Sequence, residues 1–187
     1  MTIKILALLA LYLPLVAAAM SPAAERTLER VVRMGFVLGT ISVLPLFLVQ
    51  LAVVLLRSVF SVSFIWLQES TLYLFGAMFL LSGGALLLME GHVRVDIFYA
   101  KLPEKRRHLI DFLGTILFVL PLSMLIIFVS WDYVATSWAQ MERSQEASGI
   151  HAVFLLKSLI PTFAVLLLFA GELQALRFFR KLGGQHA

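Results

Sequence analysis

The chain has 187 residues, of which 61% are hydrophobic and 14% charged, and its mean hydropathy is +0.97. Soluble domains are nearer half apolar and a quarter charged, and a chain of this length cannot bury so much apolar surface in one core, so we predict an integral membrane protein. The net charge of +4 comes from basic residues in short segments between apolar runs, which is typical of membrane orientation and argues against nucleic acid as a partner.

Residues 1–20 form the first predicted element, a short apolar run that follows Lys4. The small residues at its end resemble the cleavage site of a signal peptide. Cleavage would leave residues 21–35 outside and invert every later helix, against the distribution of basic residues described below. We therefore favour an uncleaved extra helix that spans the membrane or lies at its interface, with a removed signal peptide as the alternative.

The predicted membrane domain, residues 21–180, begins with an amphipathic segment. Ser21 followed by Pro22 is a typical helix start. Leu28 and Val32 then fall on one side of the helix and the charged residues on the other, so we predict a helix that lies along the membrane surface.

Four later segments reach the length of about 20 apolar residues that crosses a bilayer. They run from about residue 36 to 56, 71 to 89, 109 to 130 and 152 to 170, the last with an amphipathic extension to 179. Pro45, Pro121 and Pro161 fall near the middle of three of them, where membrane helices tolerate proline. Residues 131–141, with tryptophans at helical spacing, predict a second surface-lying amphipathic helix. Both amphipathic segments would either anchor the chain at the membrane interface or brace a partner protein. The predicted fold class is an all-α helical membrane bundle.

The basic residues predict its orientation. Most of them lie between the second and third long spans, in the tail that includes residues 181–187, and before the first long span, whereas the two opposite loops carry one each, Arg57 and Arg143. By the positive-inside rule the C-terminus is cytoplasmic.

The sequence predicts no catalytic, cofactor or metal site. The histidines at positions 92, 108, 151 and 186 lie at span ends or in the tail, where no two of them could hold one haem inside the bilayer. No histidine–carboxylate spacing predicts a zinc or di-iron site, no glycine-rich phosphate loop is present, and there is no cysteine.

Two kinds of residue remain as structural or interface candidates. Gly76 and Gly83, one heptad apart, predict a smooth face for close helix packing. Glu69 and Lys157 lie near span ends, so we expect both side chains to snorkel to water. For Lys157 the alternative is a salt bridge to an adjacent helix or subunit.

Three features in order carry a resemblance to a known family. His92, Val93, Val95 and Asp96 form an H-V-x-V-D element directly after the second span, Glu69 opens that span, and a lysine precedes a Leu-Ile-Pro step at residues 157–161. Together with the topology, over about residues 25–180, they resemble the small permease subunit of tripartite ATP-independent periplasmic (TRAP) transporters.

The resemblance implies a role in the bacterial inner membrane. In that family a large permease subunit carries the substrate and sodium sites and moves as an elevator, and a periplasmic binding protein delivers the substrate, commonly an organic acid anion. The small subunit would be a non-catalytic scaffold, held by the large permease and by membrane lipids, in sodium-driven secondary uptake without ATP hydrolysis.

The resemblance also suggests roles for single residues. His92, Arg94 and Asp96 would order the cytoplasmic turn or contact the large subunit. Glu69 and Arg57 would lie on the periplasmic side, where they meet the binding protein or are merely solvated at the interface.

Two alternative functions of the chain stay open, namely a membrane anchor of a respiratory enzyme and a stand-alone small exporter or channel.

Overall fold

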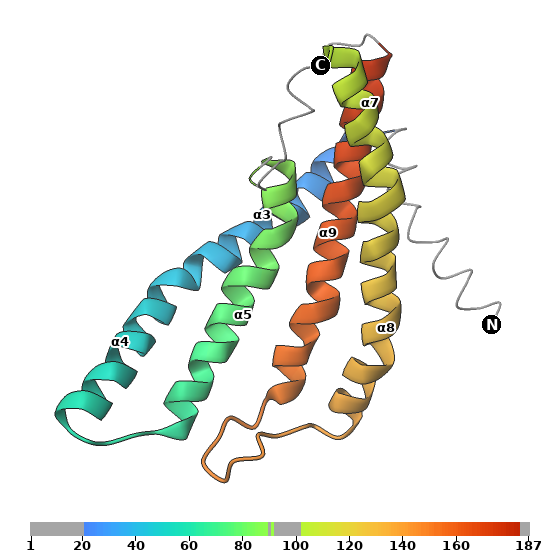
Figure 1. The fold of residues 1–187 in the computed structure, drawn as a ribbon. Helices are drawn as coiled ribbons and strands as arrows, with labels where there is room; N and C mark the ends of the chain where they lie inside the picture. The colour runs from blue at the N-terminus through green and yellow to red at the C-terminus, as the bar shows by residue number, and fades with distance from the viewer. Residues whose placement is uncertain (1–20, 90, 92–101, 184–187) are drawn as a thin grey trace.

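The computed structural model describes residues 21–89, 91 and 102–183 (Figure 1). The helices are α3 (Pro22–Ile41), α4 (Val43–Val59), α5 (Ile65–Leu88), α7 (Glu104–Gly114), the π-helical segment η1 (Thr115–Val119), α8 (Leu120–Ala139) and α9 (Val153–Leu182). Four stretches are long and apolar enough to cross a membrane, namely Pro22–Val59, Ile65–Leu88, Glu104–Ala139 and Val153–Leu182. The predicted all-α architecture with four long helices is confirmed for this part of the chain. The predicted extra helix over residues 1–20 lies outside the described residues.

The amphipathic segment at residues 21–33 is the beginning of a long helix. Ser21 caps α3 by accepting a hydrogen bond from the backbone N–H of Ala23 at 3.3 Å, and Pro22 occupies the first turn, as predicted. The helix continues past the predicted segment to Ile41 and forms one 38-residue stretch with α4, while its position along the membrane surface stays a prediction. Its apolar face packs inside the protein, where Leu28 contacts Leu173 and Leu176 of α9.

Prolines explain two local irregularities of the long helices. Pro45 has no N–H to donate to the carbonyl of Ile41, and the helix is interrupted at Ser42, whose hydroxyl donates to the carbonyl of Leu38 at 2.9 Å. Pro121 likewise frees a carbonyl four residues earlier, and the π-helical segment η1 lies directly before it. Proline is thus accommodated by a shift in the hydrogen-bond register while the helix continues.

The segment at residues 131–141 is not a separate helix. It is the continuation of α8, which runs unbroken to Ala139 because no proline or glycine separates it from the span. Trp138 packs on α9: its indole N–H donates to the hydroxyl of Ser158 at 2.8 Å, and its ring centroid lies 4.7 Å from that of Phe154.

Helix α9 is the centre of the bundle and contacts α3, α5, α7 and α8. We call the end of the bundle where α9 finishes the C-terminal end, and the end with the loop at residues 140–152 the loop end. The core lies toward the C-terminal end, with Leu168 and Leu173 of α9 at 0% and 1% exposure beside Val32 and Leu120 from α3 and α8. Toward the loop end α4 leans away from α8 and α9, and no residue of α4 is buried (Figure 1).

Glycines let α5 approach α9 closely. A β-carbon at Gly84 would lie 2.7 Å from the carbonyl oxygen of Leu166, and one at Gly83 would lie 2.6 Å from Cε2 of Phe163. At Gly76 it would lie 3.1 Å from Cδ1 of Leu159. These glycines face the same helix, so the small residues of α5 form a packing surface for α9.

This packing predicts the effect of a single methyl group. Gly84→Ala should destabilise the protein by about 1–3 kcal/mol, because the neighbouring Leu166 carbonyl belongs to the backbone and cannot turn away. The measurement is the thermal unfolding midpoint of the purified chain in detergent. Gly114→Ala is the matched control, since nothing lies within 4 Å of its β-carbon position. Equal midpoints for the two variants would contradict the packing argument.

Candidate functional site

A cluster of polar contacts lies at the loop end of the bundle, and we call it the loop cluster. It joins Glu69 in the second turn of α5, Tyr133 near the end of α8 and Lys157 in the second turn of α9 to the loop at residues 140–152. One carboxylate oxygen of Glu69 accepts a hydrogen bond from the hydroxyl of Ser144, and the other accepts one from the backbone N–H of Ile150 at 2.6 Å. Both acceptor groups of Glu69 therefore serve to hold the loop.

Lys157 holds the beginning of the same loop. Its ammonium nitrogen lies 2.5 Å from Oε2 of Glu142 and 4.1 Å from the centroid of the Tyr133 ring. The Lys157 side chain is 17% exposed and the Glu142 side chain 34%. The sequence left open whether Lys157 snorkels to water or forms a salt bridge. The structure shows an ion pair, and its partner is Glu142 in the α8–α9 loop of the same chain. A cation over an aromatic ring adds attraction to that pair.

The loop itself is folded back by its own backbone. The N–H of Ser144 donates to the carbonyl of Ile150 at 3.2 Å, and the N–H of Val153 donates to the carbonyl of Glu142 at 3.1 Å. Gly149 lies so close to Glu69 that a β-carbon there would be 2.7 Å from Oε2. The loop thus folds back on itself, and the residue that lies against the Glu69 carboxylate is a glycine, Gly149.

The electrostatics of the loop cluster match this geometry. The hydrogen bond from the ammonium of Lys157 is the main reason that the pKa of the Glu142 carboxyl lies below its ordinary value. Glu142 is therefore charged at neutral pH, and the pair is an ionic contact. The carboxylates of Glu69 and Glu142 are thus each bonded to a donor within the chain, and these bonds hold the loop at residues 140–152 in place.

The other residues singled out in the sequence lie elsewhere. Arg57 is exposed in the last turn of α4 and takes no part in the contacts described for the loop cluster. Gly76 and Gly83 lie between α5 and α9, away from both ends. His92, Arg94 and Asp96 lie outside the described residues. Within the described ranges, no group of three histidine, aspartate or glutamate residues is placed to hold a metal ion.

Sequence reasoning missed the partners in the loop. Ser144, Ile150 and Glu142 carry no motif, and Glu69 lies 75 residues before Ser144, a separation that no local pattern reports. One usable signal was present: Glu142 and Lys157 flank a loop that joins two spans, so opposite charges stand at the two ends of a short connection.

Two ion pairs tie the opposite end of the bundle together. Arg177 of α9 lies 3.2 Å from Oε2 of Glu29, and Arg180 lies 2.8 Å from Oε2 of Glu25, both in the first turns of α3. The C-terminal end of α9 is thus bound to the beginning of α3 by charge as well as by the apolar contact of Leu28.

Comparison with protein families identifies the chain. The family model described as the DctQ component of tripartite ATP-independent periplasmic transporters matches residues 46–181, which is more than half of the sequence. The chain belongs to the DctQ family. It is thus the small component of a TRAP transporter, a multi-pass membrane protein of a non-catalytic family, and the family resemblance drawn from the sequence is confirmed. Neither a curated protein nor a solved structure matches the chain significantly.

The match places the loop cluster inside the DctQ region and α3 before it. Residues 46–181 take in most of α4 and all of α5, α7, α8 and the loop at residues 140–152. α3, which ends at Ile41, precedes the matched region although it packs on α9.

The hydrogen bonds from the loop to Glu69 predict how the loop responds when this residue is substituted. Glu69→Gln replaces one acceptor oxygen by an N–H group that faces a donor, so the amides of residues 144–150 should exchange with deuterium about tenfold faster. The measurement is hydrogen–deuterium exchange by mass spectrometry. Glu146→Gln removes an exposed carboxylate of the same loop and should leave exchange unchanged. If Glu69→Gln exchanges like Glu146→Gln, Glu69 does not hold the loop.

The lowered pKa of Glu142 predicts a dependence of stability on pH. Because the folded state binds this proton less readily than the unfolded state, the pair stabilises the fold fully above the unfolded pKa of about 4.3 and is lost as pH falls through the folded pKa. Unfolding midpoints of the unaltered chain and of Lys157→Met should therefore differ by a constant amount near neutral pH. The difference should shrink below about pH 4.3. A difference that persists unchanged in acid would show that the ion pair does not cause it.

Proposed function

We propose that the chain is the static scaffold of its TRAP transporter, packed against the large permease subunit while that subunit moves as an elevator. In this proposal uptake is secondary, driven by an ion gradient that we infer to be sodium, and the substrate is an organic anion delivered by a periplasmic binding protein. The observation that carries the proposal is the DctQ match over residues 46–181, which includes two of the four long helices completely and all but the last residue of a third.

The packing of α9 supports a scaffolding role. A moving partner needs a frame that does not move with it, and a frame is rigid where helix backbones lie in contact. α9 is in contact with α5 at Gly83 and Gly84, and Gly171 of α9 faces α8, where a β-carbon would lie 2.9 Å from Cδ2 of Leu120. These contacts leave little room for α9 to slide.

The distribution of charge supports an orientation with the C-terminus in the cytoplasm. The C-terminal end carries the basic residues of α3 and of the last turns of α9, namely Arg26, Arg30, Arg33, Arg177, Arg180 and Lys181. The loop end carries Arg57 and Arg143. With the positive-inside rule, residues 181–187 form a cytoplasmic tail, residues 21–180 the membrane domain, and the loop cluster faces the periplasm.

The contacts of the loop cluster refine the roles proposed for single residues. Both carboxylate oxygens of Glu69 are bonded to the loop, so we propose that Glu69 shapes the surface that meets the binding protein and that Arg57 contributes an exposed charge to it. For His92, Arg94 and Asp96 we keep the two proposals made from the sequence, namely an ordered cytoplasmic turn or a contact with the large subunit.

Purification with partners tests the proposal. The tagged chain should bring down a stoichiometric, much larger polytopic protein from native membranes in mild detergent, as identified by mass spectrometry. The complex, reconstituted with its binding protein, should take up an organic anion only when a sodium gradient is present. A chain that purifies alone, or that transports by itself in liposomes, would overturn the scaffold proposal in favour of an exporter or channel.

A variant in the H-V-x-V-D element gives the same experiment a second readout. Asp96→Ala should lower the yield of the complex or the rate of uptake. Glu104→Ala removes an exposed carboxylate from the first turn of α7 and serves as the matched control. Equal yield and uptake for the two variants would remove Asp96 from the proposed interface.

A further inference from the structure

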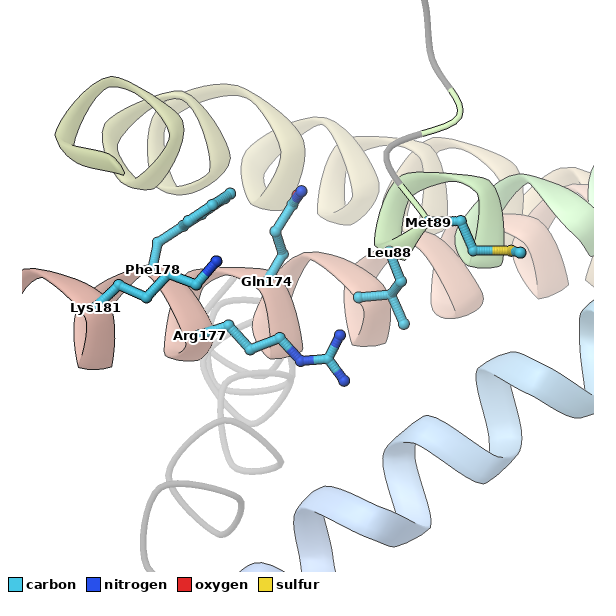
Figure 2. Close-up of a pocket in the computed structure, with 6 residues that line it drawn as sticks. All are labelled: Leu88, Met89, Gln174, Arg177, Phe178 and Lys181. Atoms are coloured by element: carbon cyan, nitrogen blue, oxygen red, sulfur yellow. The ribbon is translucent and has the colours of Figure 1, made fainter. Parts of the chain in front are cut away.

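A cavity of about 310 Å³ opens at the C-terminal end of the bundle, between the end of α5 and the last turns of α9 (Figure 2). Among the described residues it is lined by Leu88, Met89, Gln174, Arg177, Phe178 and Lys181. Neither the family match nor the scaffold role assigns anything to this cavity. Its volume is within the range of small-ligand sites, at the lower end.

The cavity carries a positive charge on one side. Arg177 and Lys181 are four residues apart and so lie on the same face of α9, and Figure 2 shows both side chains extending along that helix toward the end of α5. Arg177 is paired with Glu29 at 3.2 Å, an exposed contact that leaves guanidinium donors for another acceptor. Lys181 makes no ion pair with the described residues, and its ammonium lies 6.0 Å from the centroid of the Phe178 ring.

The charge balance favours an anion. Among the described residues, two unit positive charges face one carboxylate, that of Glu29, whereas the C-terminus of α9 contributes only about half a negative charge. The amide of Gln174 donates to the carbonyl of Leu87 at 3.5 Å, which is a weak bond, so this amide is also available as a donor. An anionic oxygen in the cavity would thus have donors of three kinds within the lining.

The opposite wall is apolar. Leu88 and Met89 end α5, and Met89 is 65% exposed. A small inorganic anion gains nothing from such a wall. A molecule in which an anionic group is joined to hydrocarbon fits both walls at once.

The depth of the cavity in the bundle indicates the source of such a molecule. Leu88 is the last residue of one candidate span, and Lys181 is next to the last residue of another. With the end of the apolar helix α5 at the membrane interface, the cavity would lie at the depth of lipid phosphates. Basic pockets between helices at this depth bind anionic headgroups.

We propose that this cavity binds the phosphate of an anionic phospholipid, with Arg177 and Lys181 on the phosphate and the end of α5 against the glycerol and upper acyl chains. The described lining residues all come from this chain, and the proposal does not depend on the proposed scaffold role. Bound there, the lipid would lie beside the Arg177–Glu29 pair that joins α9 to α3.

Native mass spectrometry of the purified chain tests the proposal. The chain is mixed with phosphatidylglycerol or phosphatidylcholine in the same detergent, and the retained lipid is counted. The unaltered chain should retain phosphatidylglycerol in preference. Arg177→Gln and Lys181→Gln should each lower that retention about fivefold, since a basic residue near an anionic headgroup contributes about that factor.

Two controls separate lipid binding from loss of fold or of general charge. Lys105→Gln removes an exposed cation from the first turn of α7 and should retain phosphatidylglycerol fully. Glu29→Gln breaks the same ion pair as Arg177→Gln but keeps the guanidinium, so its retention should be equal or higher. Lys181→Gln breaks no ion pair among the described residues and keeps the test open if Arg177→Gln does not fold.

Three outcomes would overturn the proposal. The first is equal retention of the two lipids by the unaltered chain. The second is a loss of retention in Lys105→Gln as large as that in Lys181→Gln. The third is displacement of phosphatidylglycerol by millimolar inorganic phosphate, which would assign the site to free phosphate.

Discussion

The closeness of α9 to its neighbours is the constraint on which the rest of this structure depends. Inside a bilayer, lipid tails are as apolar as leucine, so no hydrophobic force drives one helix against another. What remains is van der Waals contact, and it is strong only where backbones approach closely. Gly84 against the Leu166 carbonyl provides such an approach for α5, and Gly35 provides one for α3, where a β-carbon would lie 2.7 Å from Cδ1 of Leu166. One leucine of α9 thus packs against both helices.

This central packing explains why polar contacts are found where they are. The helices are joined by small residues and apolar side chains in the core, and the two ends, where helices diverge or charges begin, are joined by ionic contacts. At the loop end Glu69 and Lys157 hold the connection between α8 and α9. At the C-terminal end Arg177 and Arg180 hold the beginning of α3. Ion pairs that water still reaches contribute little energy each, so their effect is to fix position more than to add stability.

Much of the fold could be predicted from the sequence, because spans are a property of local composition. Apolar runs of about 20 residues predicted four helices, and the expectation that the spans tolerate proline holds for Pro161 inside α9 and for Pro45 and Pro121 beside local irregularities. The continuity of α3 with α4 could not be seen in the same way, since an amphipathic pattern is the same whether its apolar face meets lipid headgroups or another helix. Leu28 and Val32 have a protein partner, and only the fold shows it. The contacts of Glu69 with Ser144 and Ile150 join residues 75 and 81 positions apart, which depends on how the spans are arranged in space.

The length of the first helix connects these observations with the membrane. The 38-residue helical stretch formed by α3 and α4 extends about 57 Å, nearly twice the thickness of the hydrocarbon layer, so it must either incline or leave the bilayer at one end. Figure 1 shows α3 and α4 inclined to α8 and α9, with the charged beginning of α3 beside the end of α9. That junction is also where Arg177 meets Glu29 and where the cavity opens. An anionic lipid bound there would lie beside the ion pair that joins the inclined helix to α9, so the occupancy of the cavity and the strength of that junction would be linked through Arg177.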